Sequence, residues 1–256
     1  MSKYKYNVKR SESINKEFLH GPIKCTELPK TVDLRSLCPP VYDQGDLGSC
    51  TANAGCAANS MRLARPDLMF SRLYLYYKER QLEGDIQDDG GAQISDIGKV
   101  LQEFGVCLEK EDPYDVGTFT ATPTAEDDAE AAQYKISSYK SLSDIDHIKA
   151  YLATNKKPVL MGMDVYESFE SDAVAATGKV PMPSRSEQCL GGHAVLIVGY
   201  IDGPAASSFF DRLFKKPSGC FIVRNSWGES WGDKGYFYLP YEYVLEKLAF
   251  DFWTIM

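Results

Sequence analysis

The chain has 256 residues, a formal net charge of −8 at pH 7 and 12% aromatic residues. This length permits one large domain or two small ones, and the aromatic content excludes an intrinsically disordered chain. The negative charge argues against nucleic acid or an anionic membrane as the main partner. We expect no secretory signal peptide, because the polar start leads into no apolar segment, and the apolar stretch at 194–199 is too short to span a bilayer.

The number and spacing of the cysteines limit the disulfides and metal sites that the chain can form. The chain has seven cysteines, an odd number, so at least one thiol is unpaired within it: Cys25, Cys38, Cys50, Cys56, Cys107, Cys189 and Cys220. None of them forms a CxxC pair, so the sequence predicts no zinc site, and we expect neither a metal nor a cofactor.

Residues 1–31 are polar and carry only isolated apolar side chains. This pattern predicts an extended arm with little regular structure. Two interpretations stay open, a disordered tail and a segment that lies across the body of the protein and its active site. The arm is too short and too polar to fold as a domain of its own.

Residues 43–65 form the central motif. A glycine-rich turn, Gly45 to Gly48, leads directly into Cys50, and alanine-rich helix-forming residues follow until Pro66. Cys50 is therefore expected on the first turn of a helix, where unpaired backbone N–H groups and the helix dipole favour the thiolate. The alternative is a buried cysteine that acts as a small apolar residue.

The rest of the first half is predicted to be helical, with helices at 71–80 and at 94–104 separated by the Gly90-Gly91 turn. Residues 112–130 contain prolines and an acidic patch, and they are expected to cross to the second half without regular structure. That half is predicted to begin with a short capped helix over 143–155. Apolar, β-branched runs then predict strands at 158–165, 194–201, 220–224 and 235–239.

The histidines narrow the choice of a partner for Cys50. His20 lies in the polar arm, and His147 lies on a helix face that is expected to be solvated. His193 instead follows two glycines and precedes an apolar strand, a poor position for a core residue and a good one for a site. Asn225 ends a later strand and is followed by Trp227, which can exclude water from a hydrogen bond to the asparagine.

Together these motifs resemble the papain family of cysteine peptidases, and within it the xylellain-like group without a signal peptide. The resemblance extends from Val32 to about Leu239. It depends on the motifs Asp33-Leu34-Arg35, Gln44-Gly45-x-x-Gly48-Ser49-Cys50, Gly90-Gly91, Gly192-His193-Ala194-Val195 and Asn225-Ser226-Trp227-Gly228-x-x-Trp231-Gly232. His193 follows Cys50 by 143 positions, within the family range of about 130–150. Asn225 comes later, at 175 positions, because residues 202–218 are inserted before it.

The resemblance implies an α+β fold of two lobes, a helical lobe (32–127, after the arm) and a β-barrel-like lobe (128–256), with a cleft between them. It also implies that Cys50 is the nucleophile, that His193 exchanges its proton and that Asn225 orients the imidazole under the shield of Trp227. Gln44 and the Cys50 backbone N–H would form the oxyanion hole.

For substrate binding, the resemblance implies that Gly90, Gly91 and Gly192 leave room for an extended peptide beside Trp227. The expected partner is a peptide or protein substrate, and we expect the protein to be a monomer. In relatives the chain end helps to line the pocket for the residue two before the cut. If Phe250 or Asp251 reaches that pocket, apolar or basic side chains are favoured.

The sequence also departs from the family pattern. Leu47 replaces a family cysteine, and Asp88 stands near the position of its partner, so both halves of a family disulfide are missing together. This loss and the expected lack of a signal peptide favour a reducing, cytoplasmic or non-classically exported setting. Thr51 replaces an aromatic residue, which predicts altered packing under the cleft. The inserted residues 202–218 are expected to form a long hairpin, an amphipathic flap or a docking surface.

The sequence leaves three functions in competition. The first is a cysteine endopeptidase that acts through a Cys50–His193 thiolate–imidazolium pair and a thioester acyl-enzyme. The second is a catalytically silent scaffold that binds a partner. The third is an exopeptidase or another acyl transfer at the same site. The endopeptidase is favoured over the third because no histidine-bearing insertion is present to bind a chain terminus.

Overall fold

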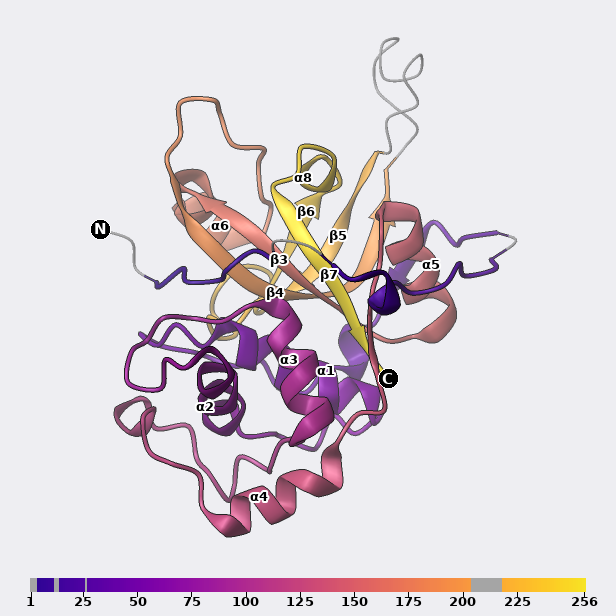
Figure 1. Ribbon diagram of the computed structural model, residues 1–256. Coiled ribbons are helices and arrows are strands. Elements are labelled where there is room, and N and C mark those ends of the chain that lie inside the picture. The colour runs from indigo at the N-terminus through magenta and orange to yellow at the C-terminus, as the bar shows by residue number, and fades with distance from the viewer. Residues whose placement is uncertain (1–3, 12–13, 26, 204–217) are drawn as a thin grey trace.

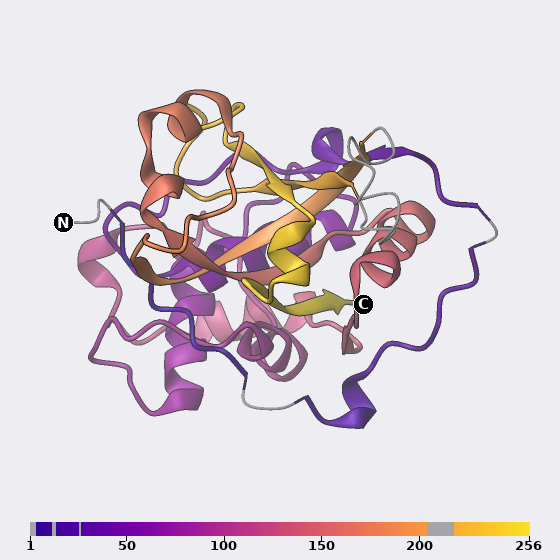
Figure 2. The ribbon, with the colours of Figure 1, turned by 90° about the horizontal axis from the view of Figure 1, so that it is seen from above.

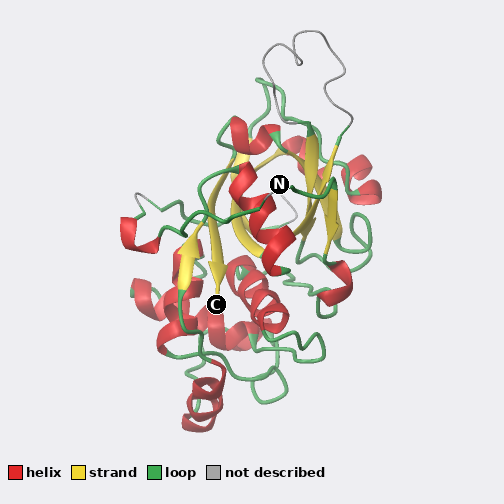
Figure 3. Cartoon of the chain, turned by 90° about the vertical axis from the view of Figure 1, so that its right-hand side faces the viewer, coloured by secondary structure: helices red, strands yellow, loops and turns green. Residues whose placement is uncertain are grey.

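The computed structural model describes residues 4–11, 14–25, 27–203 and 218–256. Helices gather in one lobe and an antiparallel sheet forms the other, with the helices below the strands in Figure 1. In the side view of Figure 3 most of the strands lie in the upper half of the molecule. The expected α+β, papain-like class is confirmed. Most of the insertion at 202–218 lies outside the described residues.

The helical lobe is built from α1 (Cys50–Arg62), α2 (Arg72–Glu83), α3 (Ile94–Glu103) and α4 (Ala125–Ala131). Helix α1 is buried on all sides, which is why its sequence shows small residues without an amphipathic stripe. A Cβ at Gly55 would lie 2.7 Å from the Ile97 side chain and 2.8 Å from Leu75. Small residues therefore let α2 and α3 pack closely against the helix that begins at Cys50.

The second lobe is a sheet with strand order β2-β7-β3-β4-β5-β6, and β1 pairs with β4 outside this path. Each of these strand pairs is antiparallel. The strand bounds are β1 (Thr31–Asp33), β2 (Tyr139–Ser141), β3 (Val159–Tyr166), β4 (Cys189–Asp202), β5 (Gly219–Arg224), β6 (Tyr236–Pro240) and β7 (Ala249–Ile255).

Short helices connect or cover the strands: α5 (Ile145–Asn155), α6 (Asp172–Thr177) and α8 (Glu242–Leu245). Short 3-10 helices are η1 (Lys16–Phe18), η2 (Arg35–Leu37), η3 (Val116–Thr118), η4 (Ala132–Tyr134) and η5 (Glu167–Glu170). Helix α5 confirms the helix expected over 143–155, although its N-cap is Asp144, whose side chain accepts the N–H of His147.

The sequence prediction was wrong for part of 112–130. Helix α4 forms inside this stretch because Thr124 and Asp127 make a reciprocal capping box at its start. Asp127 is buried, so the acidic patch is only partly solvated. The acidic residues of its first turn also favour a helix start electrostatically.

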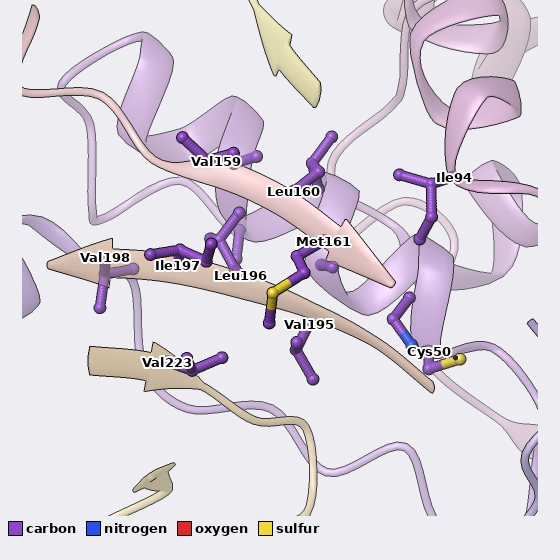
Figure 4. Packing of buried hydrophobic residues seen from close by; sticks show 14 of the residues in the cluster. Cys50, Ile94, Val159, Leu160, Met161, Val195, Leu196, Ile197, Val198 and Val223 are labelled. Atoms are coloured by element: carbon purple, nitrogen blue, oxygen red, sulfur yellow. Dashed lines mark hydrogen bonds between the residues drawn. The ribbon is translucent and has the colours of Figure 1, made fainter. Parts of the chain in front are cut away.

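The two lobes share one hydrophobic core. The buried α1 packs against β4, and Figure 4 shows Cys50 near Val195 of β4 and Ile94. The core thus fixes the start of α1 relative to the part of β4 around His193, which lies inside the strand and not before it as the sequence predicted. These are the two places from which the sequence predicted a nucleophile and a base.

The N-terminal arm is ordered where the structure describes it. Figure 1 shows it running between the strands above and the helices below, and Figure 2 shows it continuing around the outside of the molecule. Phe18 of η1 stacks on Tyr139, with ring centroids 5.0 Å apart. The expectation of an extended segment across the body therefore describes residues 4–11 and 14–25, with one short helix added.

All seven cysteines lie in the described part of the chain and are free thiols. Within the described ranges, no helix is long and apolar enough to cross a membrane.

Candidate active site

Cys50 is the first residue of α1, and its sulfur lies against the second lobe. The backbone N–H of Ala194 points at the Cys50 Sγ at 3.5 Å. Because Ala194 follows His193 on β4, this contact places the predicted nucleophile next to the predicted base. Cys50 is only 1% exposed.

His193 and Asn225 form the hydrogen bond that the sequence predicted. The His193 Nε2 and the Asn225 Oδ1 are 2.8 Å apart, and the same oxygen accepts the N–H of Ser226 at 2.9 Å. An atom that accepts a backbone N–H is the amide oxygen, so Nε2 must be the donor. The neutral ring then carries its lone pair on Nδ1, which is buried without a hydrogen-bond partner. This is the tautomer that a general base needs.

Trp227 covers one face of this pair. Its ring stacks on His193 with a centroid distance of 5.1 Å and an interplanar angle of 25°. Tyr4 of the arm stacks on Trp227 at 3.8 Å and 2°. Trp227 therefore shields the imidazole, as expected, and is itself covered by the arm. A hollow of about 370 Å³ remains beside Tyr4 and Trp227, bordered by Asp43 and Asp46.

Gln44 is held in place by four hydrogen bonds. Its Oε1 accepts the Ser226 hydroxyl at 2.5 Å, its Nε2 donates to the Leu47 carbonyl at 2.9 Å, and its backbone N–H donates to the Ser226 carbonyl at 2.9 Å. The Tyr114 hydroxyl also donates to the Gln44 carbonyl at 2.9 Å. A side-chain amide has two N–H groups, so one remains for a further acceptor.

The arm lies directly against the glycines expected to bind substrate. Val8 N–H donates to the Gly192 carbonyl at 3.1 Å, and Lys9 N–H donates to the Ala92 carbonyl at 3.2 Å. A Cβ at Gly91 would lie 2.1 Å from the Asn7 carbonyl, and one at Gly192 would lie 2.6 Å from the Val8 carbonyl. The glycines are therefore required for this close backbone approach. Gly90 instead faces Asp85.

Polar and charged side chains fix the arm to both lobes. Lys5 pairs with Asp89 at 2.7 Å, Lys9 pairs with Glu83, and the Tyr6 hydroxyl donates to Glu170 at 2.5 Å. The arm's basic side chains thus meet acidic groups of the cleft walls.

Burial sets the protonation of both candidate catalytic groups. It raises the pKa of Cys50 to about 12 and lowers the pKa of His193 to about 4. With the arm in place both groups are therefore neutral at pH 7. The sequence-based expectation of a thiolate at the helix start is wrong for this form of the protein, because loss of solvation outweighs the helix N-terminus.

Thr51, which replaces a family aromatic residue, joins a buried carboxyl under the cleft. Its hydroxyl donates to Glu79 Oε2 at 2.6 Å, whereas Glu79 Oε1 is buried without a partner. Burial raises the pKa of Glu79 well above 4.5. Burial thus favours the protonated, uncharged form of Glu79 next to the helix that carries Cys50.

The structure thus brings Cys50, His193, Asn225, Gln44 and Trp227 together. It also places Gly91 and Gly192 opposite each other across the arm. Sequence reasoning gave no role to Ser226, although it lies inside a quoted motif between two residues that received one. It also missed the specific arm residues that fill the cleft, because no local pattern connects them with glycines far along the chain.

Among the described residues, no three His, Cys, Asp or Glu side chains gather in a way that could hold a metal ion. The site places a thiol near an imidazole whose tautomer is fixed by an amide, an arrangement that suits nucleophilic catalysis by the thiol.

Comparisons with known proteins identify the family of this chain. A family profile described as "Papain family cysteine protease" matches residues 28–245. "Uncharacterized peptidase C1-like protein L477" of Acanthamoeba polyphaga mimivirus is 41% identical over 227 residues, covering 83% of this chain and 68% of that protein. "Cathepsin B-like CP3" of Giardia intestinalis is 28% identical over 236 residues, covering 85% and 71%.

Among solved structures, xylellain, a cysteine protease from Xylella fastidiosa, is similar over 100% of this chain and 97% of its own, with a TM-score of 0.81 and 36% identity. Digestive procathepsin L2 of Tenebrio molitor shares the fold, with a TM-score of 0.72 and 21% identity over 99% of this chain and 78% of its own. The family match covers most of the chain, and its range contains Gln44, Cys50, His193, Asn225 and Trp227 but not the arm residues 4–11. The chain belongs to the papain family of cysteine proteases.

Proposed function

We propose that this cysteine peptidase is an endopeptidase in which Cys50 attacks the peptide carbonyl and His193 handles the proton. The observation that carries the proposal is the His193–Asn225 hydrogen bond at 2.8 Å, which leaves Nδ1 as the basic nitrogen of a residue whose neighbour Ala194 contacts the Cys50 sulfur. An imidazole held in this tautomer can take the thiol proton and later protonate the leaving amine.

The reaction then runs through two acyl transfers. The Cys50 sulfur adds to the carbonyl, the amine leaves with the proton from His193, and a thioester remains. Water, deprotonated by the same imidazole, hydrolyses the thioester and restores the thiol. The free Gln44 N–H and the Cys50 backbone N–H would stabilise the oxyanion in both steps, and each such donor typically contributes about 10²–10³ in rate.

Substrate binding is proposed to use the same backbone groups that now hold the arm. The Gly192 carbonyl and the Ala92 carbonyl each accept an N–H from the arm. An extended peptide could form equivalent main-chain hydrogen bonds between the two walls, which is recognition by β-type pairing. The glycines at 91 and 192 keep both walls open to a backbone at close range.

We further propose that residues 4–11 are a removable cover. Cys50 is 1% exposed and His193 is fully buried, and Tyr6 and Val8 lie against the backbone beside His193. Burial of these groups is also the observation that favours the alternative function, a catalytically silent binding scaffold. The two functions differ in one respect: a covered enzyme becomes reactive when the arm moves, and a scaffold does not.

The test is covalent labelling combined with product analysis. A peptidyl epoxide directed at thiols should label Cys50 in the folded chain with a stoichiometry of one. Cys50→Ala should abolish both labelling and turnover, whereas Cys25→Ala, which removes an exposed thiol, should leave both unchanged. Mass spectrometry of the products from a mixed peptide library should show internal cleavage. Removal of single residues or dipeptides from chain ends would identify an exopeptidase, and an unlabelled Cys50 without any turnover would identify the scaffold.

A further inference from the structure

Asp89 connects three segments that are far apart in the sequence. Both of its carboxylate oxygens accept the backbone N–H of Gly48, at 3.0 and 3.1 Å. The Tyr76 hydroxyl of α2 donates to Asp89 Oδ1 at 2.5 Å, and the Lys5 ammonium lies 2.7 Å from Oδ2. The Asp89 side chain is only 12% exposed, so these three donors bind a carboxylate that is largely withdrawn from solvent.

Gly48 lies in the loop that carries the proposed oxyanion donors. It stands between Gln44, which would contribute a side-chain N–H, and Cys50, which would contribute its backbone N–H. A Cβ at Gly48 would lie 2.9 Å from Asp89 Oδ1, so a larger residue would displace the carboxylate. The Gly48 N–H is thus the point at which the loop 44–50 is bound to the segment that leads into Gly91.

Tyr76 extends this contact to the cleft wall. Its hydroxyl donates to Asp89 and accepts the backbone N–H of Gly91 at 3.2 Å. Burial, and then the hydrogen bond to Asp89, raises the pKa of Tyr76, so the hydroxyl keeps the proton that it donates. Asp89 therefore fixes Gly48 directly and Gly91 through Tyr76.

A buried arginine holds the segment 86–89 from inside the helical lobe. Arg80 has no exposed surface, and its guanidinium donates to the carbonyls of Ile86 and Phe119. The guanidinium carbon lies 4.3 Å from the centroid of the Tyr76 ring. Its charge also interacts with Asp89, which offsets part of the cost of withdrawing the carboxylate from water.

No disulfide joins the loop to the wall. All seven cysteines lie in the described part of the chain as free thiols, and neither 43–49 nor 85–91 contains one. Gly48 and Asp89 directly follow Leu47 and Asp88, the two positions noted above for the missing family disulfide. Asp89 thus connects the two segments by hydrogen bonds and charge, where no covalent bridge does so.

The arm also binds Asp89, through separate contacts. Lys5 pairs with the carboxylate, and Asn7 Nδ2 donates to the Asp89 carbonyl at 2.7 Å. Gly48 and Tyr76 belong to the body of the protein, so their hydrogen bonds to Asp89 do not require the arm. The two sets of contacts can therefore be removed one at a time.

We propose that Asp89 is a positioning residue for the oxyanion hole, which holds the loop 44–50 against the Gly91 wall through Gly48 and Tyr76. Where it concerns catalysis, this inference rests on the proposed peptidase function, because Asp89 acts through Gln44 and Cys50. The attachment of Gly48 itself can be measured without any turnover.

The first measurement is hydrogen exchange of single backbone amides in the full chain, followed by NMR. Asp89→Asn keeps the size of the side chain and removes its charge. It should accelerate exchange of the Gly48 amide by about 10–10²-fold, because a charge-assisted hydrogen bond is lost. Asp88→Asn is the matched control, since it removes the same charge from the exposed neighbouring side chain and should leave Gly48 unchanged. Lys5→Ala should accelerate the amides of residues 4–11 and leave Gly48 unchanged.

Tyr76→Phe is the second variant, in case Asp89→Asn does not fold. Phenylalanine fills the same buried space and removes only the hydroxyl. Exchange of the Gly91 amide should accelerate, because its acceptor is lost, and that of Gly48 should accelerate by a smaller factor. The amide of Ile197 in the core of β4 should be unchanged in every variant and reports that the fold is intact.

The second measurement is turnover of one peptide substrate. Asp89→Asn should lower kcat by about 10-fold with a smaller change in KM, less than the 10²–10³-fold typical for outright loss of an oxyanion donor. In the Gln44→Ala background the same substitution should have a much smaller effect, because the donor that it displaces is already absent. A residue that only stabilised the fold would have the same effect in both backgrounds.

The outcomes separate this proposal from the proposed function. Unchanged Gly48 exchange in Asp89→Asn, or in Tyr76→Phe if only that variant folds, would overturn the attachment. Equal acceleration in Asp88→Asn or Lys5→Ala would overturn it as well, because net charge or the arm would then hold the loop. An equal loss of kcat with and without Gln44 would overturn the positioning role. Absence of turnover in the wild type would overturn the proposed peptidase function, whereas Gly48 exchange would still decide whether Asp89 holds the loop.

Discussion

Removing residues 1–10 should activate the thiol of Cys50, and the structure gives the size of the effect. With the arm in place burial raises the pKa of this thiol to about 12. At pH 7 only about one molecule in 10⁵ then carries the thiolate, the form that reacts with alkylating reagents. Once the arm is removed, solvent and the imidazole of His193 reach the sulfur, and the thiolate becomes the main species.

Truncation should raise the alkylation rate of Cys50 by less than it raises the fraction of Cys50 that is thiolate. A thiolate of lower pKa is a weaker nucleophile, and its rate falls with a Brønsted coefficient of about 0.4–0.5. A pKa decrease of about five units therefore lowers the reactivity of each thiolate by about two to two and a half powers of ten. The thiolate population rises by up to about 10⁵-fold over the same change. We expect alkylation of Cys50 by iodoacetamide at pH 7 to be about 10²–10³-fold faster in the truncated chain.

The assay follows each cysteine separately by mass spectrometry of its peptide. Cys25 and Cys189 are exposed in the full chain, so their alkylation rates should be equal in both forms and serve as internal controls. Equal rates at Cys50 in the two forms would refute the argument that the arm holds the thiol neutral. A rise in all three rates would instead indicate that truncation loosens the whole fold.

Four further outcomes follow from the same contacts. Asn225→Ala should lower kcat by about 10–10²-fold, measured on one peptide substrate, because His193 loses the acceptor that fixes its tautomer. Gln44→Ala should lower kcat by about 10²–10³-fold, with the alkylation rate of Cys50 unchanged because alkylation needs no oxyanion hole. Burial lowers the pKa of His193 to about 4 from 6.5. The form with the arm on the cleft is thus stable above pH 6.5 and is lost as the pH falls toward 4. The reason is that His193 takes up a proton only when the arm has moved away. Hydrogen exchange of residues 4–11 should accelerate over this range, and an unchanged rate would contradict the linkage. Burial raises the pKa of Glu79, so the stability of the wild type should fall as pH rises above 4.5, by about 1.4 kcal/mol per pH unit, and urea unfolding of Glu79→Gln should lack this slope.

The sequence alone determined the family and the papain-like α+β fold, and it nominated site residues that the fold brings close together. It could do so because Cys50, His193 and Asn225 each lie in a local motif whose turn or strand chemistry is visible in the residues. The order and spacing of these motifs then specify the fold. Local signals also located α1, α2, α3, α5 and the main strands. They failed at α4, where a capping box outweighed the neighbouring prolines and acidic residues.

The tertiary structure decided the charge state of the site and the path of the arm. A helix N-terminus favours a thiolate, but whether the thiol ionises depends on solvation, and Cys50 is only 1% exposed with the arm in place. Likewise, no pattern in residues 4–11 predicts that Asn7 lies on Gly91, or that Arg10 meets Asp164 and Phe250. These contacts join segments more than 80 residues apart. Only packing in three dimensions can define them, because each partner alone is an ordinary polar or glycine residue in the sequence.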